Sequence, residues 1–171
     1  MSTQARTQPP PRPVFSYRER WTENIPTRLR DKDHWVLWRY EWDGKKKWTK
    51  VPYKVHKPRS KASTTDPQDW DSFHEAVRIY EKLKGTIHAA DGVGYVFSHQ
   101  DGLVGVDLDR CIEGGEVLPW ARAYLDRLMP TYAEVTPSGT GLHLIVFGQL
   151  PGGGVKVGPG SRGPLPPACE R

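Results

Sequence analysis

The sequence predicts an α+β fold in which helices lie on one face of a mainly antiparallel sheet. Short runs of aromatic and β-branched residues recur in pairs that are joined by turn signals such as Asp43-Gly44. Two longer segments, around residues 67–84 and 118–129, instead place apolar residues at helical spacing. The resulting order of elements, ββα-ββ-α-ββ, is typical of helices that cover one side of an antiparallel sheet.

The first half of the chain predicts a hairpin followed by a helix. Residues 34–42 and 48–53 favour strands, and three lysines, 45–47, lie at the tip between them. Asp66 and Pro67 supply the N-cap and the first position of a helix that extends to about residue 84. The apolar stripe of this helix, which we assign to the core, consists of Trp70, Phe73, Val77 and Tyr80.

The second half of the chain predicts four more strands and one more helix. Two of the strands flank a turn at 99–102, and the other two flank a tight turn at 137–141. The helix begins near Leu118 and ends before Pro130, which cannot continue it. The four strands are expected at residues 93–98, 103–109, 131–136 and 142–147.

Length and composition predict the domain organisation. A chain of 171 residues suits one domain, which we expect over residues 21–150. The proline-rich residues 1–20 and residues 151–171, with six Gly and five Pro, are predicted to be disordered. The sequence holds no apolar run of membrane-spanning length and no apolar leader, so we expect a cytoplasmic protein that contacts no membrane. Cys111 and Cys169 are expected to be free thiols.

The positive charge of the chain is concentrated in one segment. Residues 28–61 hold twelve Lys or Arg against four Asp or Glu, whereas the whole chain carries a formal charge of only +5. Trp and Tyr residues are interleaved with these charges, and exposed aromatic rings beside cations can stack the bases of a nucleic acid. The alternative is a solvated basic face, which the charges alone would favour.

Asp107 and Asp109 are the candidate metal ligands. They end the strand expected at 103–109, and strand alternation places both carboxylates on one face. Carboxylate oxygens suit Mg²⁺ or Mn²⁺, the ions that accompany nucleoside triphosphates. We therefore predict both as catalytic residues and metal ligands, although a D-x-D pair alone is weak because strand ends often carry acids that face solvent.

The second candidate element is the turn that follows residue 136. A hydroxyl at Ser138 and backbone N–H groups between two glycines could bind phosphate oxygens. His143, which leaves this turn, could donate to a phosphate or stabilise charge on the leaving group, so we predict it as catalytic. The alternatives are an ordinary hairpin turn and a structural histidine. With two lysines from the hairpin, the predicted nucleotide-binding residues are Lys50, Lys54, Ser138, Gly139, Gly141 and His143.

Several motifs between residues 35 and 150 occur together in one known family. They include Trp35-Val-Leu-Trp38, Gly105-Val-Asp-Leu-Asp-Arg-Cys111 and Tyr132-Ala-Glu-Val-Thr-Pro-Ser-Gly-Thr-Gly-Leu-His143. In this combination the chain resembles the primase-polymerase (prim-pol) domains of phage and plasmid replication proteins, in the archaeo-eukaryotic primase superfamily. The resemblance implies an RRM-like sheet with a small added N-terminal α/β unit. It also implies Asp107 and Asp109 as metal ligands, with Ser138 and His143 at the incoming nucleotide.

The resemblance further implies an activity. The family synthesises or extends primers on a single-stranded DNA template from nucleoside triphosphates, with Mg²⁺ or Mn²⁺. A role in the replication of a mobile element, with a replicative helicase as partner, would follow.

The chain departs from the family at one point. The family carries a third acidic ligand on a strand shortly after the histidine strand, where this chain has Pro151-Gly-Gly-Gly. We therefore expect a domain that is incomplete at its C-terminus, truncated after the histidine motif, with an open sheet edge and a weakened metal site. The alternatives are an inactive module that binds single-stranded nucleic acid, a non-functional remnant, and a metal-dependent nuclease.

Overall fold

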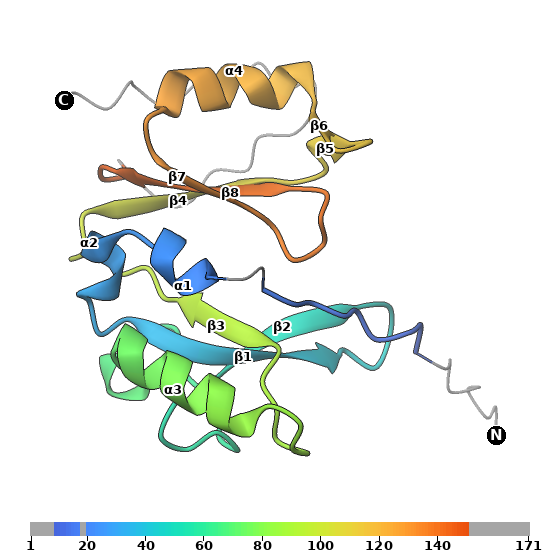
Figure 1. The fold of residues 1–171 in the computed structure, drawn as a ribbon, viewed down its shortest axis with the longest axis vertical. Coiled ribbons are helices and arrows are strands. Elements are labelled where there is room, and N and C mark those ends of the chain that lie inside the picture. Colours follow the sequence, from blue (N-terminus) through green and yellow to red (C-terminus); the bar gives the residue numbers. More distant parts are fainter. Residues whose placement is uncertain (1–8, 18–19, 151–171) are drawn as a thin grey trace, which may run out of the picture. The chain divides into compact units, whose positions relative to one another are not determined.

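The structure is a computed structural model that describes residues 9–17 and 20–150 (Figure 1). The chain divides into two compact units, Met1–Val96 and Phe97–Arg171. Each unit contains helices and antiparallel strands, which confirms the predicted α+β class.

The predicted domain organisation is not decided by this division. The expected domain over residues 21–150 stays a prediction, because one domain can consist of two compact units. The predicted disordered tail, 151–171, lies outside the described residues, as do residues 1–8 and 18–19 of the predicted disordered lead-in.

The first unit is built on a three-stranded antiparallel sheet in the order β2-β1-β3. β1 (Trp35–Trp42) pairs with β2 (Trp48–Tyr53) on one side and with β3 (Gly92–Tyr95) on the other. The predicted hairpin is therefore confirmed. Its loop is held by Asp43, whose Oδ1 accepts hydrogen bonds of 2.8, 2.8 and 3.1 Å from the backbone N–H groups of residues 45, 46 and 47.

The helix predicted from Pro67 begins later than expected. Asp66 caps only the 3₁₀ turn η1 (Pro67–Asp69), after which Trp70 is extended. Asp71 then exchanges two backbone hydrogen bonds of 2.9 Å with Trp35, and this pairing holds the chain out of a helical conformation. Ser72 caps the true helix by accepting from the N–H of Glu75. The helices of this unit are α1 (Trp21–Asn24), α2 (Thr27–Arg30) and α3 (Phe73–Leu83).

The two faces of the first sheet are covered differently. On the face of Trp35, the ring of Phe73 from α3 packs with a centroid separation of 4.7 Å. On the opposite face the indole of Trp38 lies across Gly92, where an added Cβ would come within 2.5 Å of the indole nitrogen. Glycine is required there because any side chain would displace the tryptophan.

The described part of the lead-in, residues 9–17, runs along this second face. The ring of Phe15 lies 5.6 Å from that of Trp38, and the carbonyl of Pro10 accepts from the indole N–H of Trp48 at 3.0 Å. At the edge of β3 the Tyr17 hydroxyl donates to the carbonyl of Val93 and accepts from its N–H. These contacts make the segment part of the first unit.

The second unit has a three-stranded antiparallel sheet in the order β4-β8-β7. The strands predicted at 93–98 and 103–109 do not pair with each other, since β3 pairs with β1 and β4 pairs with β8. A small ribbon of two short strands, β5 (Ile112–Glu113) and β6 (Glu116–Val117), precedes the helix. The elements of the main sheet and its helix are β4 (Leu103–Leu108), α4 (Pro119–Leu128), β7 (Tyr132–Val135) and β8 (Leu142–Phe147).

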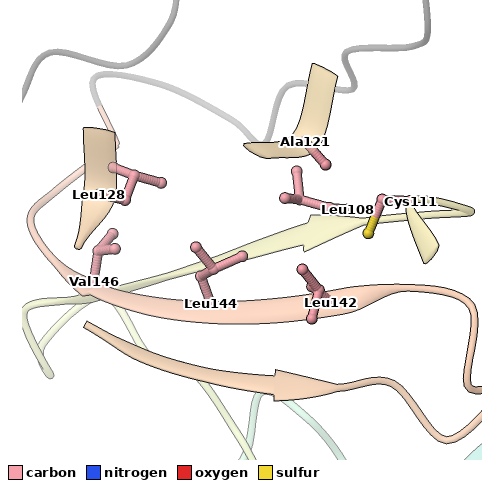
Figure 2. Close-up of a cluster of buried hydrophobic side chains, with 7 residues drawn as sticks. All are labelled: Leu108, Cys111, Ala121, Leu128, Leu142, Leu144 and Val146. Atoms are coloured by element: carbon pink, nitrogen blue, oxygen red, sulfur yellow. The ribbon is translucent and has the colours of Figure 1, made fainter. Parts of the chain in front are cut away.

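Helix α4 packs on one face of this sheet, and the core lies between them (Figure 2). Strand β8 contributes Leu142, Leu144 and Val146 to this core, and Leu144, in the middle, is fully buried. Because strand residues alternate, the residues next to these core positions must lie on the other face. The core residues drawn in Figure 2 are Leu108, Cys111, Ala121, Leu128, Leu142, Leu144 and Val146.

No helix within residues 9–17 and 20–150 is both long enough and apolar enough to cross a bilayer.

Candidate functional site

Three side chains form a row across the second sheet, on the face opposite to α4. The strand register places Asp107 of β4 opposite His143 of β8, and His143 opposite Glu134 of β7. Their neighbours Leu108, Leu142 and Leu144 point into the core instead. The alternation of apolar and polar residues in β4 and β8 therefore brings an imidazole between two carboxylates.

The two ring nitrogens of His143 face different carboxylates. Nδ1 lies 3.0 Å from Glu134 Oε1, within hydrogen-bond distance, and Nε2 lies 3.7 Å from Asp107 Oδ1. An ionised carboxylate can only accept, so when Glu134 is ionised Nδ1 of His143 is the donor of this hydrogen bond. The other oxygen of Glu134 accepts from the Tyr132 hydroxyl at 2.7 Å. Glu134 thus holds the ring in one orientation, with Nε2 turned toward Asp107.

Asp109 lies one residue beyond the end of β4, in the turn that follows it. The strand is one residue shorter than predicted. Strand alternation therefore does not put the side chain of Asp109 on the same face as that of Asp107. Both aspartates are exposed, and the side chain of Asp107 is 61% exposed. Burial raises the pKa of the nearby Cys111 thiol, and the charges of Asp107 and Asp109 act in the same direction. Both carboxylates therefore add to the negative charge that acts on the Cys111 thiol.

The turn between β7 and β8 presents a chain of hydroxyl groups. Ser138 Oγ lies 2.9 Å from Thr136 Oγ1 and 3.0 Å from Thr140 Oγ1. The backbone N–H groups that we expected to bind phosphate are already used inside the turn. Gly139 N–H donates to the carbonyl of Thr136 and Gly141 N–H donates to its hydroxyl. The hydroxyl groups of Ser138 and Thr140, both of which are exposed, are donors that this turn offers to a ligand.

The two glycines shape this turn. Gly139 has a φ of +76°, a conformation that favours glycine. At Gly141 an added Cβ would lie 2.8 Å from the backbone oxygen of Leu108, so the turn packs directly on the end of β4. The carbonyl of Thr140 also accepts from the N–H groups of Cys111 and Ile112, at 2.8 and 3.0 Å. These contacts hold the turn between β7 and β8 beside the segment that carries Asp109.

The predicted site residues divide between the two units. Lys50 and Lys54 belong to the first unit, where Lys54 forms an ion pair with Asp69 and the ammonium group of Lys50 lies 5.9 Å from the ring centre of Trp38. The second unit brings the others together on one face and around one turn. Those residues are Asp107, Asp109, Ser138, Gly139, Gly141 and His143.

Glu134 is the site residue that sequence reasoning missed. The sequence did contain a signal for it. A tight turn joins the strands at 131–136 and 142–147, and this hairpin places residue 134 opposite residue 143. Counting the hairpin register outward from the turn would have paired the two residues. Asp107 could not be added to the row in this way, because the pairing of β4 with β8 is not local.

The donor set limits what kind of metal site this can be. In the described ranges, no group of three or more His, Cys, Asp or Glu side chains is arranged to hold a metal ion. Mg²⁺ commonly binds through one or two carboxylates and takes its remaining ligands from water and substrate phosphates. Asp107 and Asp109 fit that kind of site, in which the nucleotide completes the coordination.

Comparison with known proteins identifies the family. No family model matches the sequence. Over 119 residues, 68% of this chain, the sequence is 36% identical to the DNA primase-polymerase of Nitratiruptor phage NrS-1. The matched region spans about 15% of the length of that relative. The similarity confirms the resemblance found in the sequence motifs, and the chain belongs to the family of phage-type primase-polymerases.

Proposed function

We propose that this chain catalyses metal-dependent nucleotidyl transfer on a single-stranded DNA template. The 3′ hydroxyl of a primer would attack the α-phosphorus of a nucleoside triphosphate and release pyrophosphate. The observation that carries the proposal is the row of Asp107, His143 and Glu134 beside a turn lined with hydroxyl groups. The phage relative, which is named a DNA primase-polymerase, supports the same activity.

Each residue has a proposed role. Asp107 and Asp109 would hold Mg²⁺ or Mn²⁺, which supplies charge neutralisation at the triphosphate and lowers the pKa of the attacking hydroxyl. Ser138 would donate its hydroxyl proton to a phosphate oxygen. His143, with Nδ1 held by Glu134, would present Nε2 to the triphosphate, and as an imidazolium it can donate there.

The proposal also covers the fold of the second unit, the cellular process, the partner and the location. The β-α-β-β order of β4, α4, β7 and β8, with the helix on one face, supports an RRM-like fold for the second unit. We further propose replication of a mobile element as the process, a replicative helicase as a partner and the cytoplasm as the location. Lys50 and Lys54 are proposed to contact the triphosphate or the template.

Primer extension tests the proposed function. The protein is incubated with a primed single-stranded template, labelled nucleoside triphosphates and Mn²⁺ or Mg²⁺, with EDTA in a parallel sample. We expect primers that lengthen only when both the metal and the templated nucleotide are present. Products shorter than the primer, formed without triphosphate, would instead identify a nuclease.

A second candidate function is binding without chemistry. It is favoured by the two-carboxylate site, because within the described residues no group of three or more His, Cys, Asp or Glu side chains could hold a metal ion. Such a module would retain single-stranded DNA in EDTA and would extend no primer. The same assay, combined with a binding measurement, separates the two functions.

Glu134→Ala is expected to raise the KM for the nucleoside triphosphate by about tenfold to a hundredfold, the range known for residues that orient a metal-ligating histidine. Without the carboxylate, His143 loses the hydrogen bond that fixes its ring. Steady-state primer extension at varied nucleotide concentration measures this change.

Glu134→Gln serves as the matched variant for this prediction. Its amide oxygen can still accept from Nδ1 of His143, so we expect it to retain more of the nucleotide affinity than the alanine variant. Equal KM values for the two variants, in proteins with unchanged circular dichroism, would show that Glu134 does not position His143.

A further inference from the structure

We propose that the tip of the β1–β2 hairpin is a binding surface for single-stranded DNA. The inference deepens the proposed function, and it rests on that function only in naming the bound strand as the template. We define the hairpin tip by six residues, two of them aromatic and four of them basic: Trp42, Lys45, Lys46, Lys47, Trp48 and Lys50.

The positive charge of the hairpin tip is available to a ligand. Lys45, Lys46 and Lys47 are exposed, and within the described ranges none of their ammonium groups forms an ion pair. The carboxylate of Asp43 is occupied by the backbone N–H groups of the loop, which lower its pKa. Glu41 lies on the opposite face of the hairpin, where it binds Lys61 and Tyr53.

Two indole rings lie beside these charges. Trp42 and Trp48 are direct cross-strand partners, with ring centres 5.8 Å apart and planes at 60°. Both rings are half-buried. Lys50 follows Trp48 by two residues, so strand alternation places its side chain on the same face. The hairpin tip thus combines aromatic surface with four cations.

The rest of this face is already covered by the protein. Val36 packs in a buried cluster with Ala62 and Trp70, and Phe15 lies against Trp38. The carbonyl of Pro10 accepts from the indole N–H of Trp48 at 3.0 Å. Among the described residues of this face, the hairpin tip is therefore the part that carries exposed lysines.

The combination favours single-stranded over duplex DNA. Lysines bind the phosphates of either form, but aromatic rings gain energy by stacking on bases that are not already paired and stacked. Such platforms accept any base sequence, because every base has a π-face. This property suits a surface that receives a template.

The test is fluorescence anisotropy with a labelled ~12-nucleotide oligodeoxythymidylate, a length within known site sizes. The full chain is titrated in EDTA without nucleoside triphosphate, at several salt concentrations. The test variant combines Lys45→Gln, Lys46→Gln and Lys47→Gln. The matched control combines Lys57→Gln, Lys82→Gln and Lys84→Gln, which removes the same charge at exposed positions outside the hairpin tip.

We expect the test variant to weaken binding about tenfold or more and to lower the salt slope by about 2, since each neutralised phosphate of a single strand contributes about 0.7. The control variant should bind like the unmodified chain. Equal losses in the two variants would overturn the proposal, because binding would then follow net charge alone.

A second variant tests the aromatic part. Trp42→Leu is expected to weaken binding about tenfold with an unchanged salt slope. Binding of a duplex competitor as tight as that of the single strand, together with no effect of Trp42→Leu, would overturn the assignment to single-stranded DNA. Because these titrations use neither metal nor triphosphate, a chain that binds through the hairpin tip but extends no primer would contradict only the proposed function.

Discussion

Asp107→Asn is expected to reduce the rate of nucleotide incorporation by about 10²-fold or more. Enzymes lose activity by about this factor when they lose one preorganised group that stabilises the charge of the transition state. Asparagine keeps the volume of the side chain but removes its negative charge. The side chain of Asp107 is largely exposed, so folding should be unaffected. Primer extension under saturating triphosphate, with circular dichroism of both proteins, measures the effect.

The control for this prediction is Asp126→Asn. Asp126 is an exposed carboxylate on α4, and α4 packs on the face of the sheet opposite to Asp107. The control has the same change of charge and should extend primers at the unmodified rate. If Asp107→Asn also retained full activity, the proposed metal site would be wrong. Asp109→Asn is expected to resemble Asp107→Asn.

The second large effect concerns the stability of the second unit. Leu144→Ala is expected to lower the free energy of unfolding by about 2–5 kcal/mol. The side chain is fully buried at the centre of the cluster between β8 and α4, so its removal leaves a cavity (Figure 2). Urea denaturation of the full chain, followed by circular dichroism, measures the change.

Val135→Ala is the matched control on the neighbouring strand. Val135 is 50% exposed, and we expect its truncation to change the free energy of unfolding by no more than about 0.5 kcal/mol. Similar losses for Leu144→Ala and Val135→Ala would mean that α4 does not pack on β8. The result bears on function, because the same strand carries His143 next to Leu144.

Local signals in the sequence predicted most elements well. The strand at 142–147 and the hairpin of residues 35–53 were confirmed, since both depend on alternation and turn residues within a few positions. The helix expected from Pro67 was wrong at its start, although the capping chemistry of Asp66 was read correctly. A backbone pairing with distant Trp35 decided that boundary, and no local pattern reports such a contact.

In the candidate site, too, the sequence predicted the local features and missed those that depend on contacts within the folded chain. The residue types at 107, 109, 138 and 143 were identified from the sequence, because carboxylates, hydroxyls and an imidazole in strand and turn contexts have recognisable chemistry. Their assignment to metal and nucleotide stays a prediction. The glycine turn was also recognised, but the use of its N–H groups within the turn was not.

The sequence by itself determined the α+β class, the three strands of the main sheet and the helix of the second unit, and the membership in the primase-polymerase family. These depend on periodicity, turn chemistry and motifs, which neighbouring residues carry. Only the tertiary structure decided that β4 pairs with β8, and so that Asp107, His143 and Glu134 form one row. Strand pairing follows from burying Leu108, Leu142 and Leu144 together under α4, and that requires the whole unit to fold.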